Sequence, residues 1–235
     1  MNDGTINGNT ASICGGIEVY NGTITINSGI ISGNTARNNG GGIYVIGGTV
    51  TVNGGTINGN TADIGGGIFV NNGGIVTMNS GIISGNTARG GGIFVNSGTV
   101  TMNGGTISGN TSNSQGGGVE VGGGTFTMHG GVISGNTANN YGGGIFVNSS
   151  SATFRKLPDG GGQNSGIIYG NEETGVDANG TPLKNTASSS GGHVVHLSSS
   201  SPTRPSRNTT AGQTDQIDTT TGRGLSASGN APFGN

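Results

Sequence analysis

A repeated unit of about 25 residues constrains the fold of this chain more than any other feature of its 235 residues. The segment Gly-Thr-Ile-Asn-Gly-Asn at residues 4–9 recurs six more times in closely similar form. Its first glycine stands at Gly4, Gly29, Gly55, Gly81, Gly105, Gly131 and Gly166, so the intervals are 25, 26, 26, 24, 26 and 35 residues. A short, fixed period with one insertion is typical of chains whose units stack on one another.

Each unit contains three short segments in which apolar and polar residues alternate, for example residues 90–96, 98–103 and 105–110. Such segments, bounded by glycine and asparagine, are expected to be strands. One unit buries too little apolar surface to offset the entropy lost when its backbone is ordered, so neighbouring units must cover it. Units that stack at about 4.8 Å align like residues with like. The repeat therefore predicts an all-β fold, a single-stranded right-handed parallel β-helix with three short strands per coil and about six or seven coils.

The repeat also predicts which residues form columns along the helix axis. The inward columns are aliphatic and begin with Ile6 in the first strand, Ile17 in the second and Ile24 in the third. Asparagine recurs at a turn, where it tolerates positive φ and hydrogen-bonds to backbone groups. We interpret these residues as a structural asparagine ladder comprising Asn9, Asn34, Asn60, Asn86, Asn110, Asn136 and Asn171. The glycine triplets that precede the second strand, such as 65–67, are interpreted as tight corners because no lysine follows them as in a phosphate-binding loop.

Composition changes near residue 154, since all five prolines lie beyond it. We expect regular coils over residues 1–154, starting near residues 4, 29, 55, 81, 105 and 131. Residues 155–197 are expected to form a last irregular coil and a cap, and residues 198–235 a Ser/Thr-rich tail. The first coil has no predicted cap, and an uncovered solenoid end exposes strand edges. We therefore expect upstream coils of a longer repeat protein, or end-to-end self-association, at that end.

The order Ile-Ser-Gly-Asn-Thr-Ala, a short variable run and then Gly-Gly-Gly-Ile-Phe or Gly-Gly-Gly-Ile-Tyr occurs at residues 31–44, 83–94 and 133–146. It resembles the repeats of polymorphic outer-membrane proteins, which pair Phe-x-x-Asn with Gly-Gly-Ala-Ile. Here isoleucine stands in place of that phenylalanine, and glycine in place of that alanine. The pattern is also similar to that of other parallel β-helix repeat proteins of bacterial surfaces, with a pectin lyase-like fold. The resemblance implies an extracellular or cell-surface location and an adhesin-like or stalk role. Its implied partners are glycans or host and neighbouring surface proteins.

Charge and cysteine content argue against several classes of function. The chain has 8 Lys and Arg against 10 Asp and Glu, so nucleic-acid binding is not expected. Its single cysteine, Cys14, excludes an internal disulfide framework, and we interpret it as incidental. His193 and His196 are three residues apart in a predicted strand and so point to opposite faces. We expect no metal, no cofactor and no membrane-spanning segment.

Catalysis is not expected either, although a polysaccharide lyase or hydrolase remains the least favoured alternative. Such enzymes need clustered carboxylates, typically within about 10 Å. Glu18 and Glu120 share one outward column but lie four coils apart, about 19 Å at about 4.8 Å per coil. We interpret both as solvated glutamates.

Two outward surfaces are candidate binding sites. The second-strand column carries aromatic residues at Tyr44, Phe69, Phe94 and Phe146, which would stack against sugars if exposed. The favoured alternative is that these rings cover one another or are covered by the variable turn. The third strand repeats Thr-x-Thr in a file that is similar to the ice-binding face of β-solenoid antifreeze proteins, although Ile75 interrupts it. The file comprises Thr23, Thr25, Thr49, Thr51, Thr99, Thr101, Thr125 and Thr127.

The hypothesis that follows is a non-catalytic extracellular β-solenoid, with a carbohydrate-binding module as the first alternative and ice binding as a less favoured one.

Overall fold

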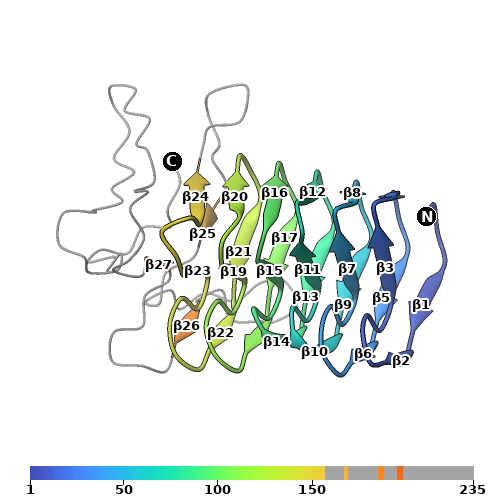
Figure 1. The fold of residues 1–235 in the computed structure, drawn as a ribbon, viewed down its shortest axis with the longest axis horizontal. Coiled ribbons are helices and arrows are strands. Elements are labelled where there is room, and N and C mark those ends of the chain that lie inside the picture. Colours follow the sequence, from blue (N-terminus) through green and yellow to red (C-terminus); the bar gives the residue numbers. More distant parts are fainter. Residues whose placement is uncertain (157–166, 169–184, 188–194, 198–235) are drawn as a thin grey trace.

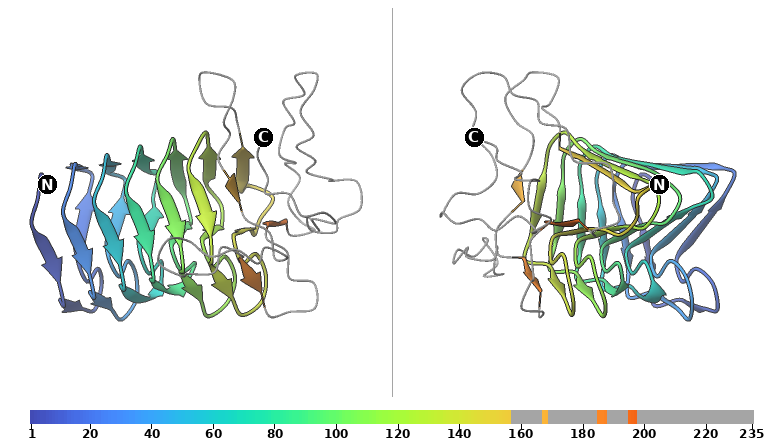
Figure 2. Two further views of the ribbon diagram at one scale, coloured as in Figure 1. Left: turned by 180° about the vertical axis from the view of Figure 1, so that it is seen from behind. Right: turned by 60° about the vertical axis from the view of Figure 1, so that its left-hand side comes forward.

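The computed structural model describes residues 1–156, 167–168, 185–187 and 195–197. Within them the chain forms strands and no helix, and every pairing between named strands is parallel. The strands stack as successive coils from the N-terminal end, where β1 lies, towards β24 and β26 (Figure 1). Turning the molecule shows the coils one behind another (Figure 2). The predicted parallel β-solenoid is confirmed.

Each coil contributes strands to four sheets, and each sheet runs along the whole stack. Sheet A contains β1 (Thr5–Asn7), β5 (Ile30–Ser32), β9 (Thr56–Asn58), β13 (Ile82–Ser84), β17 (Thr106–Ser108), β21 (Val132–Ser134) and β25 (Ile167–Ile168). Sheet B contains β2 (Thr10–Ala11), β6 (Thr35–Ala36), β10 (Thr61–Ile64), β14 (Thr87–Arg89), β18 (Thr111–Ser112), β22 (Thr137–Ala138) and β26 (Thr186–Ala187).

The other two sheets are built in the same way. Sheet C contains β3 (Ile17–Tyr20), β7 (Ile43–Ile46), β11 (Ile68–Asn71), β15 (Ile93–Val95), β19 (Val119–Val121), β23 (Ile145–Val147) and β27 (Val195–Leu197). Sheet D contains β4 (Thr23–Ile26), β8 (Thr49–Val52), β12 (Gly74–Met78), β16 (Gly98–Met102), β20 (Thr125–Met128) and β24 (Thr153–Lys156).

Each coil contains four strands, so the prediction of three strands per coil is wrong. The Thr-Ala pair that follows the ladder asparagine forms a separate short strand, and these strands make up sheet B. The pair was too short to be recognised from alternation. It becomes a strand because coil-to-coil stacking places the same pair beside it in the next coil, where backbone hydrogen bonds form.

The core consists of the predicted inward columns. Ile31, Ile57, Ile83, Ile107 and Ile133 align in sheet A, and each is almost completely buried. Sheets C and D contribute aliphatic, methionine and phenylalanine columns to the same cluster. Burial of these apolar side chains between neighbouring coils is the main favourable contribution to folding.

The glycine triplets form corners, as predicted. Gly65 has φ of +66°, and a Cβ added to it would lie 2.6 Å from the Cβ of Phe69. A Cβ on Gly66 or Gly67 would lie 2.7 or 2.5 Å from a backbone oxygen of the next coil. Only glycine fits this corner, because the backbone of one coil lies directly against the next.

Candidate functional surfaces

The second-strand aromatic column is present but buried. Tyr44, Phe69 and Phe94 are partners in adjacent strands of sheet C. Their rings stack, with centroids 4.9 Å apart for Tyr44–Phe69 and 5.4 Å apart for Phe69–Phe94. The exposed fractions of the four predicted residues Tyr44, Phe69, Phe94 and Phe146 are 8%, 4%, 4% and 3%.

The candidate site with exposed rings is therefore contradicted, and the favoured interpretation, that the rings cover one another, is confirmed. The aromatic side chains project from the outward face of sheet C, but the connection between sheets B and C covers that face. Cys14 in this connection, Ile64 on β10 and Ile46 on β7 pack against the rings. Phe146 stacks with Tyr141, with ring centroids 6.3 Å apart.

Glu120 occupies the aromatic position in the fifth coil, between Phe94 and Phe146. The interpretation of Glu120 as a solvated glutamate is wrong, because its side chain is 0% exposed. Oε1 of Glu120 accepts hydrogen bonds from Nη2 of Arg89 at 2.9 Å and from Nε at 3.2 Å. The guanidinium also lies 5.3 Å from the centroid of the Phe94 ring. Glu18, in contrast, is exposed as expected.

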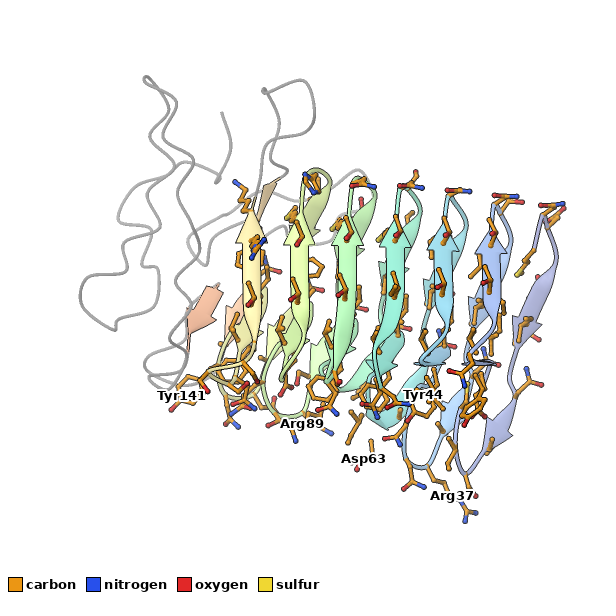
Figure 3. All side chains as sticks on the ribbon, turned by 45° about the horizontal axis from the view of Figure 1, so that its top comes forward. Arg37, Tyr44, Asp63, Arg89 and Tyr141 are labelled. Carbon is orange, nitrogen blue, oxygen red and sulfur yellow. The ribbon has the colours of Figure 1, made fainter. Side chains whose placement is uncertain are left out.

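The electrostatics of Glu120 follow from this burial. Desolvation raises the pKa of the carboxyl above its ordinary value, and the hydrogen bonds and charge of Arg89 offset part of that increase. Oε2 is buried without a hydrogen-bond partner. Arg89 lies at the edge of the stack with Arg37, Asp63 and Tyr141 (Figure 3). Its pairing with Glu120 is the one ion pair between described residues, and it links sheet B of one coil to sheet C of the next.

Cys14 lies in the same apolar cluster as Tyr44, Phe69 and Phe94. Burial raises the pKa of its thiol to about 11. The thiol therefore stays protonated near neutral pH, which is the unreactive form. Cys14 contributes to packing at one end of the ring stack, a role that composition alone did not indicate.

The predicted asparagine ladder is continuous from Asn9 to Asn136, and it is buried from Asn34 onwards, whereas Asn9 is exposed. Each interior asparagine donates its backbone N–H and its Nδ2 to Oδ1 of the asparagine in the following coil. Its Nδ2 also donates to the carbonyl of an isoleucine in the preceding coil, as Asn86 does to Ile57 at 3.0 Å. Asn34, Asn60, Asn86, Asn110 and Asn136 are all 0% exposed.

Asn171, which was predicted to continue the ladder, lies outside the described residues. Its expected place beside Asn136 is taken by Asn185, whose Oδ1 accepts from the backbone N and Nδ2 of Asn136, each at 2.9 Å. The extra residues of the insertion therefore lie between strand β25 and its ladder asparagine, Asn185. The sequence carried a signal for this, because Asn185 begins the same Asn-Thr-Ala triplet as Asn34 and Asn136.

The predicted threonine file forms two rows on the outward face of sheet D. The rows run in register from β4 to β24. One row is Thr23, Thr49, Ile75, Thr99, Thr125 and Thr153, and the other is Thr25, Thr51, Thr77, Thr101, Thr127 and Arg155. Ile75 is 47% exposed within the first row. The sheet D strands β4, β8, β12, β16 and β20 carry no charged residue.

Sequence reasoning missed a second asparagine ladder beside these rows. It lies at the turn between sheets D and A and is solvent-exposed, with each Nδ2 donating to Oδ1 of the preceding coil at 2.8 Å. Its members are Asn2, Asn27, Asn53, Asn79 and Asn103. The recurrence of asparagine after each third strand was the available signal.

The described residues hold no group of three His, Cys, Asp or Glu side chains placed to bind a metal ion. Within the same part of the chain, no helix has the length and apolar character that crossing a membrane requires. His196 is in β27 opposite Phe146, and His193 lies outside the described residues.

Comparison of the chain with protein-family models, with curated proteins and with solved structures finds no match.

Proposed function

We propose that this chain is a non-catalytic, extracellular β-solenoid segment that serves as a rigid stalk. The observation that supports this proposal most is that hydrogen bonds and apolar contacts join each coil to the next without a break. The buried asparagine ladder runs from Asn34 to Asn185, and one continuous hydrophobic core lies beside it. A solenoid in which the same ladder and core contacts recur between successive coils has no obvious hinge along its axis, and it is therefore expected to resist bending.

The proposed surface location rests on the resemblance of the repeat to those of bacterial surface proteins. The proposal that the chain is not an enzyme is supported by the placement of two glutamates in the part of the chain that the structure describes. Glu18 and Glu120 belong to β3 and β19, four strands apart in sheet C, and Glu120 is already paired with Arg89. Such separated carboxylates do not form the paired arrangement that glycoside cleavage uses.

A rigid stalk is expected to show uniformly slow amide hydrogen exchange across residues 29–128, measured by mass spectrometry on the full chain. The reason is that every interior strand is hydrogen-bonded to a neighbour on both sides. The same chain is expected to bind no member of a panel of glycans and matrix proteins and to cleave no acidic polysaccharide. An internal coil that exchanges rapidly would contradict the stalk, and turnover would contradict the non-catalytic proposal.

Saturable glycan binding in that panel would favour the carbohydrate-binding alternative instead. If the aromatic column were responsible, the double variant Phe69→Ala, Phe94→Ala would lose the binding. The burial of both rings does not support this alternative, because sugar stacking needs an exposed ring face.

Ice binding is a second candidate, favoured by the registered threonine rows of sheet D. Neighbouring coils place the hydroxyl and methyl groups about 4.8 Å apart along the axis, and the two rows are separated by about 6.6 Å along each strand. Threonine is stiff about χ1, so the array is already ordered before any water lattice forms on it.

If sheet D binds ice, solutions of the chain will show thermal hysteresis, and Thr101→Tyr will abolish it because the ring breaks the flat array. Ser84→Tyr, a matched substitution on the outward face of sheet A, will leave it unchanged. A parent chain without thermal hysteresis or effect on ice-crystal shape would reject this candidate.

A further inference from the structure

Four identical Asn-Gly-Gly triplets lie in the interior coils of the solenoid. The sequence Asn-Gly is prone to spontaneous deamidation in any chain, because glycine has no side chain to shield its backbone nitrogen from the asparagine side chain. Since the residues that follow asparagine are the same in all four triplets, differences in their reactivity must come mainly from the fold. The triplets are residues 39–41, 53–55, 72–74 and 103–105.

The backbone nitrogen of the first glycine is the nucleophile in deamidation, and the fold holds this nitrogen differently in the four triplets. Gly40 N and Gly73 N donate to carbonyl oxygens of the following coil at 2.9 and 2.8 Å. Gly104 N donates to a carbonyl oxygen of the preceding coil at 3.4 Å, which is longer than a strong hydrogen bond. Gly54 N donates to no described residue. Of the four nitrogens, Gly54 N is therefore the one that attacks without first breaking a hydrogen bond.

The side-chain carbonyl of Asn53 is activated as the electrophile for the same reaction. Asn53 is exposed and lies in the exposed ladder directly after β8. Its Oδ1 accepts a hydrogen bond from Nδ2 of Asn79 at 2.8 Å. A donor aimed at a carbonyl oxygen stabilises the negative charge that develops there when a nucleophile attacks the carbon. An open nucleophile and a polarised carbonyl therefore occur together at the pair Asn53 and Gly54.

We propose that Asn53 and Gly54 form a site of spontaneous modification, at which the chain converts Asn53 to aspartate or isoaspartate. Gly54 N gives up its hydrogen and attacks Cγ of Asn53. A bond forms between N and Cγ, and the bond from Cγ to Nδ2 breaks as Nδ2 leaves in ammonia. Water then opens the resulting succinimide. Addition at Cγ gives aspartate, and addition at the backbone carbonyl carbon gives isoaspartate, so the reaction consumes only water.

The product changes the surface beside sheet D. Asn53 Nδ2 donates to Oδ1 of Asn27 at 2.8 Å, and a carboxylate has no hydrogen with which to keep this bond. Because the sheet D strands β4, β8, β12, β16 and β20 carry no charged residue, the new carboxylate places a negative charge next to an uncharged face. The modification therefore interrupts the exposed ladder and changes the charge of this side of the solenoid.

Incubation of the full chain at mildly alkaline pH, followed by peptide mapping with mass spectrometry, tests the site. Asn53 is expected to deamidate about tenfold faster than Asn72, the factor that corresponds to one backbone hydrogen bond. Asn103 should react at an intermediate rate, and Asn39 as slowly as Asn72. In guanidinium chloride, which unfolds the chain, all four asparagines should react equally fast. Equal rates at Asn53 and Asn72 in the folded chain overturn the proposal, and so does the same ranking in the unfolded chain.

Two substitutions in the exposed ladder test the part that Asn79 plays. Asn79→Ala removes the donor to Oδ1 of Asn53 and is expected to slow deamidation of Asn53 several-fold. Asn103→Ala is the matched control, because it removes another amide of the same ladder but leaves both hydrogen bonds of Asn53 in place. The control should therefore deamidate at Asn53 as fast as the parent. A rate at Asn53 that is unchanged or higher in Asn79→Ala overturns the activation by Asn79.

Discussion

Replacing Asn86 with alanine is expected to lower the free energy of unfolding by about 4 kcal/mol, since buried groups on both sides lose their partners. The Asn86 side chain accepts hydrogen bonds from the backbone N and Nδ2 of Asn60, and it donates to Ile57 O and to Oδ1 of Asn110. All three asparagines are 0% exposed, so no solvent replaces the lost bonds. Urea unfolding followed by circular dichroism measures the effect.

Asn103→Ala is the matched control for this prediction. Asn103 donates to Asn79 in the exposed ladder at 2.8 Å, a distance similar to those of the buried ladder. Water can satisfy the groups that this substitution releases, so its cost is expected to stay below about 1 kcal/mol. Equal costs for the two variants would show that the buried ladder contributes no more than a surface hydrogen bond. That result would remove the main support for the stalk proposal.

The features that were predictable from the sequence are those that depend only on stacking like residues. The Ile31, Ile57 and Ile83 column follows from the period, because strands of equal spacing align whatever their detailed geometry. Alternation then decides which residues face the core. The asparagine ladder follows in the same way, since one turn residue recurs in every coil.

The errors concern features that depend on how the chain folds back over its own sheets. Alternation places Phe69 and Glu120 on the outward face of sheet C, but it does not reveal that the connection from sheet B covers that face. For the last coil, Asn171 was predicted as the ladder residue, but the structure has Asn185 in that place. The period alone does not reveal on which side of an asparagine the extra residues of an insertion lie. Both errors concern candidate site residues, which shows that periodicity specifies the scaffold better than its surfaces.

Removing Arg89 is expected to destabilise the solenoid, whereas removing Glu120 is not. Arg89→Ala leaves the Glu120 carboxylate buried with no partner for Oε1 or Oε2. The expected cost at pH 8 is about 3 kcal/mol, at the low end for breaking a buried pair. The low end applies because the Arg89 side chain is 40% exposed, so water can enter where it lay. Glu120→Phe places a ring between Phe94 and Phe146, and we expect it to be neutral or to stabilise by about 1 kcal/mol.

The pH dependence of stability separates charge from packing at this site. Because burial raises the pKa of Glu120 above its ordinary value of 4.5, the folded chain holds the proton more tightly than the unfolded chain does. The stabilisation from this proton is complete below the unfolded pKa and is lost as pH rises through the folded pKa. Glu120→Gln cannot lose a proton, so its stability relative to the parent should increase as pH rises above about 4.5. Urea unfolding of both chains over a series of pH values measures this difference. A difference that stays constant with pH would mean that the carboxyl is not desolvated, and that Glu120 contributes only through its shape.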